Sequence, residues 1–175
     1  MDNNVITTER LVLRTLNKDD ATSIFNNWAS DPEVTKYLTW PPHANIETTN
    51  KTINRWIEEE KDPKTIRFVI TLKNSDEPIG SIDVVGYTKD NPEVGYCLSK
   101  EYWNQGIMTE ACKAFSKYLL DIGFEKVLIK AVVENIGSNR VIEKCGFKFT
   151  HQEHLEHQSS FKSNPVILNC YELVK

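Results

Sequence analysis

The heptapeptide Trp103-Asn104-Gln105-Gly106-Ile107-Met108-Thr109 stands between a predicted strand and a predicted amphipathic helix. A glycine at this point lets the backbone pass close to a ligand. The first N–H groups of a helix have no partners within it, and the helix dipole adds partial positive charge there. The loop can therefore bind a pyrophosphate without a basic side chain, or it can simply make a tight strand-to-helix turn.

The segments that flank this loop predict a sheet crossed by one helix. Before the loop, three β-rich runs with short polar turns between them predict an antiparallel meander, at residues 66–72, 79–85 and 93–98. After it, apolar residues recur at helical spacing up to Ile122, and Gly123 is suited to ending that helix. The apolar run Val127–Val133 predicts a strand covered on both faces.

The two ends of the chain complete an α+β pattern. A strand within residues 9–16 precedes a helix capped by Asn17, with Asp20 three residues on and Leu16 as a hydrophobic staple. Asp31-Pro32 ends this helix, a loop follows at residues 37–44, and a second helix runs from about Ile46 until Asp62-Pro63. A short helix from about Ser138, capped by Gly146, and strands at residues 147–151 and 166–174 close the chain. With no repeat or linker, residues 1–175 are predicted to form one domain.

Composition narrows the classes of function. The chain has 175 residues, 39% hydrophobic and 26% charged, and its net charge of −4 argues against a nucleic-acid partner. No apolar stretch approaches the ~18 residues of a membrane span, and Met1–Arg10 is not a secretory signal, so we expect a cytoplasmic protein. The four cysteines form no CxxC pair and are expected to be reduced and buried; they are Cys97, Cys112, Cys145 and Cys170.

Four motifs, in order and in register, resemble the GNAT superfamily of acetyl-CoA-dependent N-acetyltransferases. They are Glu93-Val94-Gly95-Tyr96, the stretch 102–111, Asn135-Ile136-Gly137-Ser138-Asn139 and Glu143-Lys144-Cys145-Gly146-Phe147. The resemblance is closest to the branch named for ribosomal-protein N-terminal alanine and serine acetyltransferases, which the opening stretch 8–14 also fits. It covers nearly the whole chain. It implies a central, mostly antiparallel mixed sheet flanked by helices, with splayed middle strands that bind CoA.

The resemblance also implies where acetyl-CoA, the expected cosubstrate, would lie. The pyrophosphate would meet the backbone N–H groups of Gln105, Gly106, Ile107, Met108 and Thr109. The family loop usually begins with Arg or Gln and ends with Gly or Ala, whereas Trp103 and Met108 hold those places here. The strand 93–98 would splay from 127–133, so that unpaired backbone groups around Cys97 and Leu98 could bond the pantetheine arm and the thioester oxyanion.

Two residues of the last helix motif have competing interpretations. Ser138 has good N-cap chemistry, while the resemblance implies that it protonates the departing CoA thiolate. A hydroxyl can do both at once. Many GNAT enzymes use a tyrosine a few residues later for this step, and residues 141–146 contain none. Asn135 is either a plain turn residue or, by the family pattern, a contact of CoA.

The incoming amine needs a group that removes its proton, and Glu93 is the candidate for this role or for attracting the cation. The alternative is an ordinary exposed strand carboxylate. Five pleated residues separate Glu93 from Leu98, or about 16 Å at ~3.3 Å per residue, so a proton path would run through water. Cys97 could act as an acylated nucleophile, but no histidine lies near it in sequence and core packing is favoured. The spacing of His151, His154 and His157 does not bring all three to one strand face, so no metal site is expected.

Three hypotheses for function remain open at this stage. The first is direct acetyl transfer to a primary amine in a ternary complex; the others are a non-catalytic acyl-CoA-binding module and a nucleotide-binding enzyme. The absence of GxGxxG argues against the last. The acceptor could be a protein N-terminus, a polyamine, an amino acid or an aminoglycoside, contacted by the loop 37–44, the second helix and the C-terminal hairpin. The protein would be a monomer or homodimer.

Overall fold

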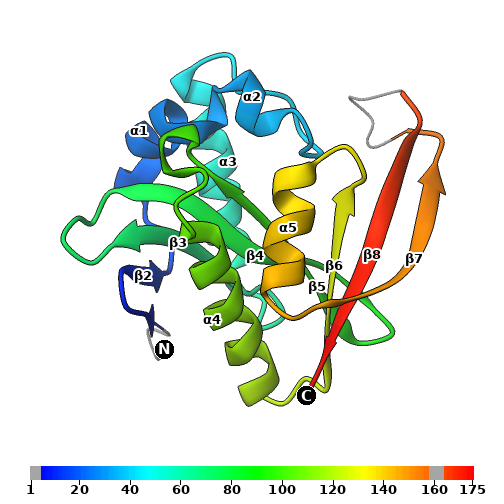
Figure 1. Cartoon of the computed structure of the whole chain (residues 1–175). Coiled ribbons are helices and arrows are strands. Elements are labelled where there is room, and N and C mark those ends of the chain that lie inside the picture. Colours follow the sequence, from blue (N-terminus) through cyan, green and yellow to red (C-terminus); the bar gives the residue numbers. More distant parts are fainter. Residues whose placement is uncertain (1–4, 158–163) are drawn as a thin grey trace.

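One eight-stranded mixed sheet forms the centre of the molecule in the computed structural model, which describes residues 5–157 and 164–175 (Figure 1). The strand order is β1-β2-β3-β4-β5-β6-β8-β7. All neighbours are antiparallel except β5 and β6, which are joined by a helical crossover. The strands are β1 (Ile6–Thr7), β2 (Leu11–Arg14), β3 (Arg67–Leu72), β4 (Pro78–Thr88), β5 (Asn91–Leu98), β6 (Lys126–Val132), β7 (Lys148–Leu155) and β8 (Val166–Val174).

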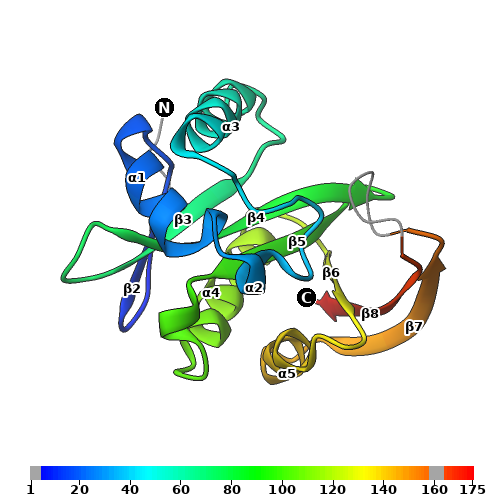
Figure 2. The ribbon, with the colours of Figure 1, turned by 90° about the horizontal axis from the view of Figure 1, so that it is seen from above.

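The helices cover the two faces of the sheet in two groups. Figure 2 shows α1 (Ala21–Ile24) and α3 (Ile46–Glu59) on one side of the sheet, with α4 (Ile107–Asp121) and α5 (Ile136–Lys144) on the other. The α4 side contains the larger core, in which Phe115 is completely buried. The other side contains a smaller core around Trp28 and Ile53. None of the described helices combines the length and apolar character needed to cross a bilayer.

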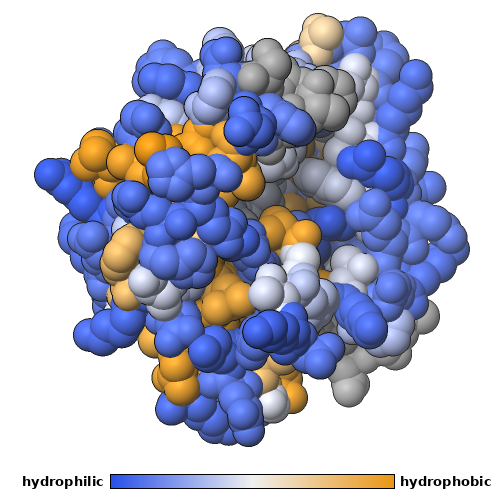
Figure 3. All heavy atoms as spheres, turned by 90° about the vertical axis from the view of Figure 1, so that its right-hand side faces the viewer, coloured by the Kyte–Doolittle hydropathy of each residue, from blue (hydrophilic) through white to orange (hydrophobic). Residues whose placement is uncertain are grey.

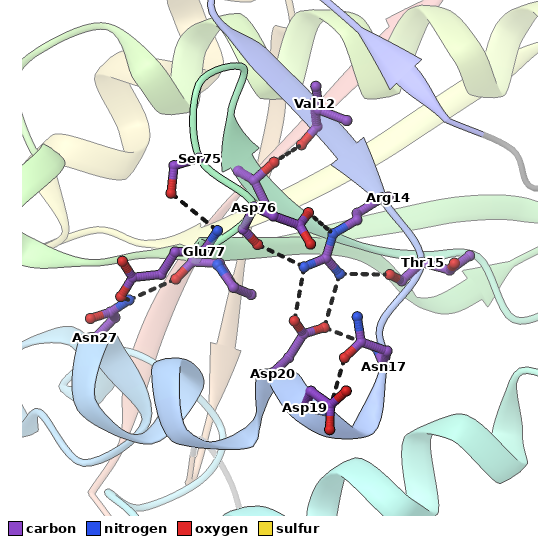
Figure 4. Close-up of polar contacts among 12 residues, drawn as sticks. Val12, Arg14, Thr15, Asn17, Asp19, Asp20, Asn27, Ser75, Asp76 and Glu77 are labelled. Carbon is purple, nitrogen blue, oxygen red and sulfur yellow. Dashed lines mark hydrogen bonds and ion pairs between the residues drawn. The ribbon is translucent and has the colours of Figure 1, made fainter.

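Capping and a buried ion pair fix the start of the helical layer. Asn17 and Asp20 form the predicted capping box. Arg14 donates to the Asp20 carboxylate through Nη2, at 2.8 Å, and through Nη1, at 2.9 Å. Its Nε donates to the Asp76 carboxylate at 2.7 Å. The hydrogen bonds from Arg14 to Asp20 raise the pKa of the guanidinium further. Figure 4 shows that this one side chain thereby links β2, the helical turn at Asp20 and the β3–β4 turn.

The fold class, the order of the predicted elements and the helical crossover are confirmed, with local corrections. The structure adds β1 and the short helix α2 (Pro32–Thr35), whose N-cap is Asp31. Proline is well suited to the first helical turn, so Asp31-Pro32 begins a helix as well as following one. The last helix starts at Ile136, two residues before Ser138. All four cysteines are buried and form no disulfide, as expected.

The outer strand β7 leaves one edge of the sheet uncovered. All of its residues except Glu153 are exposed. Figure 3 views the molecule from this side and shows a mostly hydrophilic surface on which hydrophobic residues form separate patches. Polar and charged side chains along an edge strand disfavour pairing with a strand of another molecule.

Candidate active site

The middle of the sheet opens between its two parallel strands. Strands β5 and β6 pair only at Glu93–Leu128 and Val94–Ile129, and beyond these positions they separate. A cleft of about 1260 Å³ occupies the opening, and its walls include the first turns of α4 and α5 as well as α3 and the loop before it. The cleft is therefore lined from both faces of the sheet.

Alternation along β5 identifies the backbone groups that face this opening. The Ser99 N–H donates to Ile79 O of β4 at 2.8 Å. Because amides along a strand point alternately to the two neighbours, those of Cys97 also face β4, while those of Tyr96 and Leu98 face the opening. Leu98 O already accepts from Trp103 Nε1 at 2.9 Å. The Leu98 N–H and the peptide groups of Tyr96 thus face the opening, whereas the groups expected there from the sequence were those around Cys97 and Leu98.

The loop before α4 has the backbone geometry of an anion site. Asn104 and Gly106 both have positive φ, of 59° and 75°, and Gly106 is the N-cap of α4. This turn directs the N–H groups of the first helical turn outward without a capping side chain. Ile107 and Met108 are buried in the larger core, so the bulk of Met108 is accommodated by packing. The loop lines the cleft along with Thr109.

Side chains from the turn between β1 and β2 hold this loop in place. Arg10 donates through Nη1 to Gln105 O at 3.0 Å and through Nε to Glu110 at 2.7 Å. Thr8 Oγ1 donates to the same Glu110 carboxylate at 2.6 Å. Partial burial alone would raise the pKa of Glu110, but these hydrogen bonds outweigh it and lower the pKa. The stretches 8–14 and 102–111 each carry a recognisable motif, but nothing in the sequence predicts that they meet.

The start of α5 is built around two asparagines. Asn135 is its N-cap, and its side chain accepts from the Ser138 N–H at 3.2 Å. The interpretation of Ser138 as the cap is therefore wrong. Asn139 is buried, donates to Val132 O at 3.0 Å, and accepts from Tyr171 OH at 2.6 Å. These bonds fix the first turn of α5 against the ends of β6 and β8, and hence the position of Ser138.

Ser138 has a partner that the sequence did not indicate. The Tyr96 hydroxyl, from β5, lies 2.9 Å from Ser138 Oγ and 3.3 Å from Ser138 O. Both residues line the cleft and both are half-buried. Burial raises the pKa of Tyr96 well above its usual value, and the neighbouring Cys112 adds to this effect. Tyr96 is therefore a neutral hydroxyl at any physiological pH.

Glu93 belongs to a group of charges at the closed end of the opening. Lys130 Nζ lies 3.2 Å from Glu93 Oε2 and 3.1 Å from Glu153 Oε2. All three side chains line the cleft and are partly exposed. Two carboxylates around one ammonium leave a net negative charge, which suits an approaching cation even though Glu93 is already paired.

Another carboxylate that lines the cleft, that of Asp83, was not predicted from the sequence. Asp83 of β4 lies opposite Gly95 of β5, and its side chain is 20% exposed. Burial raises the pKa of Asp83, although the charge of Arg67, at 3.4 Å, partly opposes this. A lone aspartate in a strand gives no sequence signal, because only the pairing of β4 with β5 brings it to the opening.

The structure gives no support to the alternative chemistries. Cys97 is buried against Ser81, and burial raises the pKa of its thiol to about 11, so a thiolate nucleophile is disfavoured. Within residues 5–157 and 164–175, the one group of possible metal ligands is His151, Glu153 and Cys170, whose ligand atoms lie within 4.8 Å of one another. In this group the Glu153 carboxylate is already paired with the Lys130 ammonium, at 3.1 Å.

The site combines two parallel strands that separate, a helix N-terminus at one end of the gap between them, and a cleft lined from both faces of the sheet. This combination defines the class of acyl-CoA-dependent acyltransferases. Residues 10–148 match the family model of the acetyltransferase (GNAT) domain. The chain therefore belongs to the GNAT family of N-acetyltransferases.

Relatives and solved structures agree with this assignment. The chain is 28% identical over 144 residues to the uncharacterized N-acetyltransferase p20 of Bacillus licheniformis, covering 81% of this chain and 80% of that protein. It is 27% identical over 175 residues to the uncharacterized N-acetyltransferase YoaA of Bacillus subtilis, covering 98% and 97%. Its fold is similar to RimL, the ribosomal L7/L12 α-N-protein acetyltransferase, in complex with coenzyme A (TM-score 0.84, 19% identity, 98% of each chain). It is also similar to the microcin C7 self-immunity acetyltransferase MccE in complex with acetyl-CoA and AMP (TM-score 0.82, 20% identity, 96% and 94%).

Proposed function

We propose that this enzyme transfers the acetyl group of acetyl-CoA directly to a primary amine while both substrates are bound. The observation that carries the proposal is the cleft, which is lined from both faces of the sheet. Acetyl-CoA would enter from the α4–α5 side, with its pyrophosphate on the N–H groups from Gln105 to Thr109. The amine would enter from the α3 side, past the loop 37–44. The two reactants then meet at the gap between β5 and β6.

We assign a group in the cleft to each step of the transfer. The neutral amine nitrogen attacks the thioester carbon, and the oxyanion is held by a backbone N–H facing the gap, such as that of Leu98. The amine proton passes to Glu93, through water. The C–S bond then breaks, its electron pair stays on sulfur, and Ser138 gives sulfur a proton that solvent replaces. Asn135 positions Ser138 and lies beside the cofactor path.

The acceptor side of the cleft favours a cationic amine attached to an apolar group. Its wall contains Tyr37, Trp40 and Trp56 together with the carboxylates of Glu93 and Asp83. An N-terminal peptide and a small-molecule amine both have this chemistry. RimL is named for acetylating a protein N-terminus, which places N-terminal peptides first among the acceptors to test. The turn of the C-terminal hairpin, another expected contact, includes residues 158–163, which lie outside the described part of the chain.

The kinetic order of the two substrates tests direct transfer. With both substrates varied, we expect double-reciprocal lines that intersect, because an acetyl group moves only when both substrates are bound. We also expect Cys97→Ala to retain turnover. Parallel lines, together with an acetylated enzyme that survives removal of acetyl-CoA, would show a covalent intermediate and contradict the proposal.

Replacing Ser138 by alanine is expected to lower kcat about tenfold, with acetyl-CoA affinity close to that of the wild type. A thiolate is already a fair leaving group, so loss of its proton donor has a modest effect. Asn17→Ala is the matched structural control: it removes an N-cap that is not among the residues lining the cleft, and it should cost ~1 kcal/mol in stability. Rate measurements normalised to folded protein check both variants. A Ser138→Ala enzyme with wild-type kcat would leave Ser138 without a role in the reaction.

A further inference from the structure

The hydrogen bond between Tyr96 and Ser138 joins the cofactor strand to the helix that carries the proposed proton donor. Tyr96 lies on β5, in the part of the strand that has separated from β6. Its hydroxyl reaches across the opening to Ser138, at 2.9 Å from Oγ. The family motif on α5 contains no tyrosine that could act on sulfur, so a phenol here is an unassigned polar group within the cleft.

Counting hydrogens shows why this contact matters. Each hydroxyl has one hydrogen, and the Tyr96 oxygen lies near both Ser138 Oγ and Ser138 O, at 2.9 and 3.3 Å. If the phenol donates to the carbonyl oxygen, the serine hydrogen can turn back to the phenol oxygen. If the phenol donates to Oγ, the serine hydrogen is left to point elsewhere. The second arrangement prevents that return and leaves the serine proton to point towards a departing sulfur.

We propose that Tyr96 is a positioning residue, whose phenol donates to Ser138 Oγ and thereby directs the serine proton to the CoA sulfur. This inference rests on the proposed role of Ser138. Tyr96 keeps its own proton throughout, since burial raises its pKa, so it contributes orientation and no proton to the balance. The developing negative charge on sulfur favours the second arrangement as the C–S bond breaks, because the serine hydroxyl then accepts from the phenol while it donates to the charge.

The effect of Tyr96 should be seen in kcat and should depend on Ser138. One neutral hydrogen bond corresponds to about a threefold to tenfold change in rate, so Tyr96→Phe is expected to lower kcat by that factor. The KM for acetyl-CoA should stay close to the wild-type value. In a Ser138→Ala background the same change should have no further effect, because the hydroxyl that Tyr96 orients is gone.

Tyr87→Phe is the matched control for this double-mutant cycle. It removes another phenolic hydroxyl that donates to a backbone carbonyl, that of Lys64 at 2.7 Å, and neither Tyr87 nor Lys64 is among the residues that line the cleft. It should leave kcat per folded molecule unchanged. A Tyr96→Phe enzyme with wild-type kcat, or one whose loss is equally large in the Ser138→Ala background, would overturn the inference. If Ser138→Ala has full activity the inference also fails, while acetyl transfer itself stands. A wild-type enzyme that acetylates no amine would instead contradict the proposed function.

Discussion

Gly106→Asp is expected to weaken acetyl-CoA binding by on the order of 10²-fold. Gly106 is the N-cap of α4 and has φ of 75°, so a side chain there stands directly beside the N–H groups proposed to hold the pyrophosphate. Two charges near 4 Å repel by about 1 kcal/mol in water and about 4 kcal/mol at a protein surface. Since about 1.4 kcal/mol is a factor of ten in affinity, repulsion alone accounts for this loss. Calorimetry with acetyl-CoA measures it.

The control for this variant is Gly123→Asp, at the other end of the same helix. Gly123 also has positive φ, of 116°, and a Cβ built there has no neighbour within 4 Å. The two variants share the added charge and the cost of a side chain in the left-handed region. A Cβ at Gly106 would lie 3.5 Å from Arg10 Nη2, an ordinary contact, so the fold should be retained. Equal acetyl-CoA affinities in folded Gly106→Asp and wild-type protein would remove this loop from the cofactor site.

Glu93→Gln is expected to lower kcat/KM about 10²-fold at neutral pH. A lysine-like amine with pKa ~10.4 is almost wholly protonated there, so a proton must be removed before attack. The glutamine keeps the shape of the side chain and removes the charge. Lys130 retains Glu153 as a partner, so the change leaves no unpaired ammonium. If Glu93 accepts the proton, activity should recover at high pH; if it only attracts the cation, KM should rise with kcat nearly unchanged.

Two further variants distinguish the effect of Glu93 from the effects of the neighbouring carboxylates. Glu153→Gln removes the other carboxylate of Lys130 and changes the net charge by the same amount, so an equal effect would assign the loss to charge alone. Asp83→Asn tests another carboxylate of the cleft, whose pKa is raised by burial. A pH-dependent loss in Asp83→Asn, with wild-type kinetic constants in Glu93→Gln, would transfer the role of base to Asp83.

The sequence predicted the elements well because its signals there are local. The capping box at Asn17, the apolar run that became β6 and the glycine loop before α4 each lie within a few residues, and the structure has the corresponding elements. The short strand β1 and helix α2 were missed because two and four residues are too few to show a period. Ser138 was misplaced as a cap because serine and asparagine are both good caps, and only the backbone shows which one precedes the helix.

The contacts of the site were largely beyond the sequence. Arg10 and Glu110, Tyr96 and Ser138, and Glu93 and Lys130 are far apart in the chain and meet only through tertiary packing. Their motifs could be recognised singly, but no periodicity encodes which side chains face each other across a gap. The side of β5 on which each amide points depends likewise on its register with β4.

The most direct test of the account is turnover by the wild-type protein with acetyl-CoA and a panel of amines that includes N-terminal peptides, polyamines, amino acids and aminoglycosides. Free CoA and the mass of each acceptor would be followed together. We predict that at least one primary amine becomes heavier by one acetyl group, with one CoA released for each acetyl group transferred. Tight binding of acetyl-CoA without CoA release above background hydrolysis, for every amine in the panel, would contradict the account and leave the protein as a non-catalytic acyl-CoA-binding module.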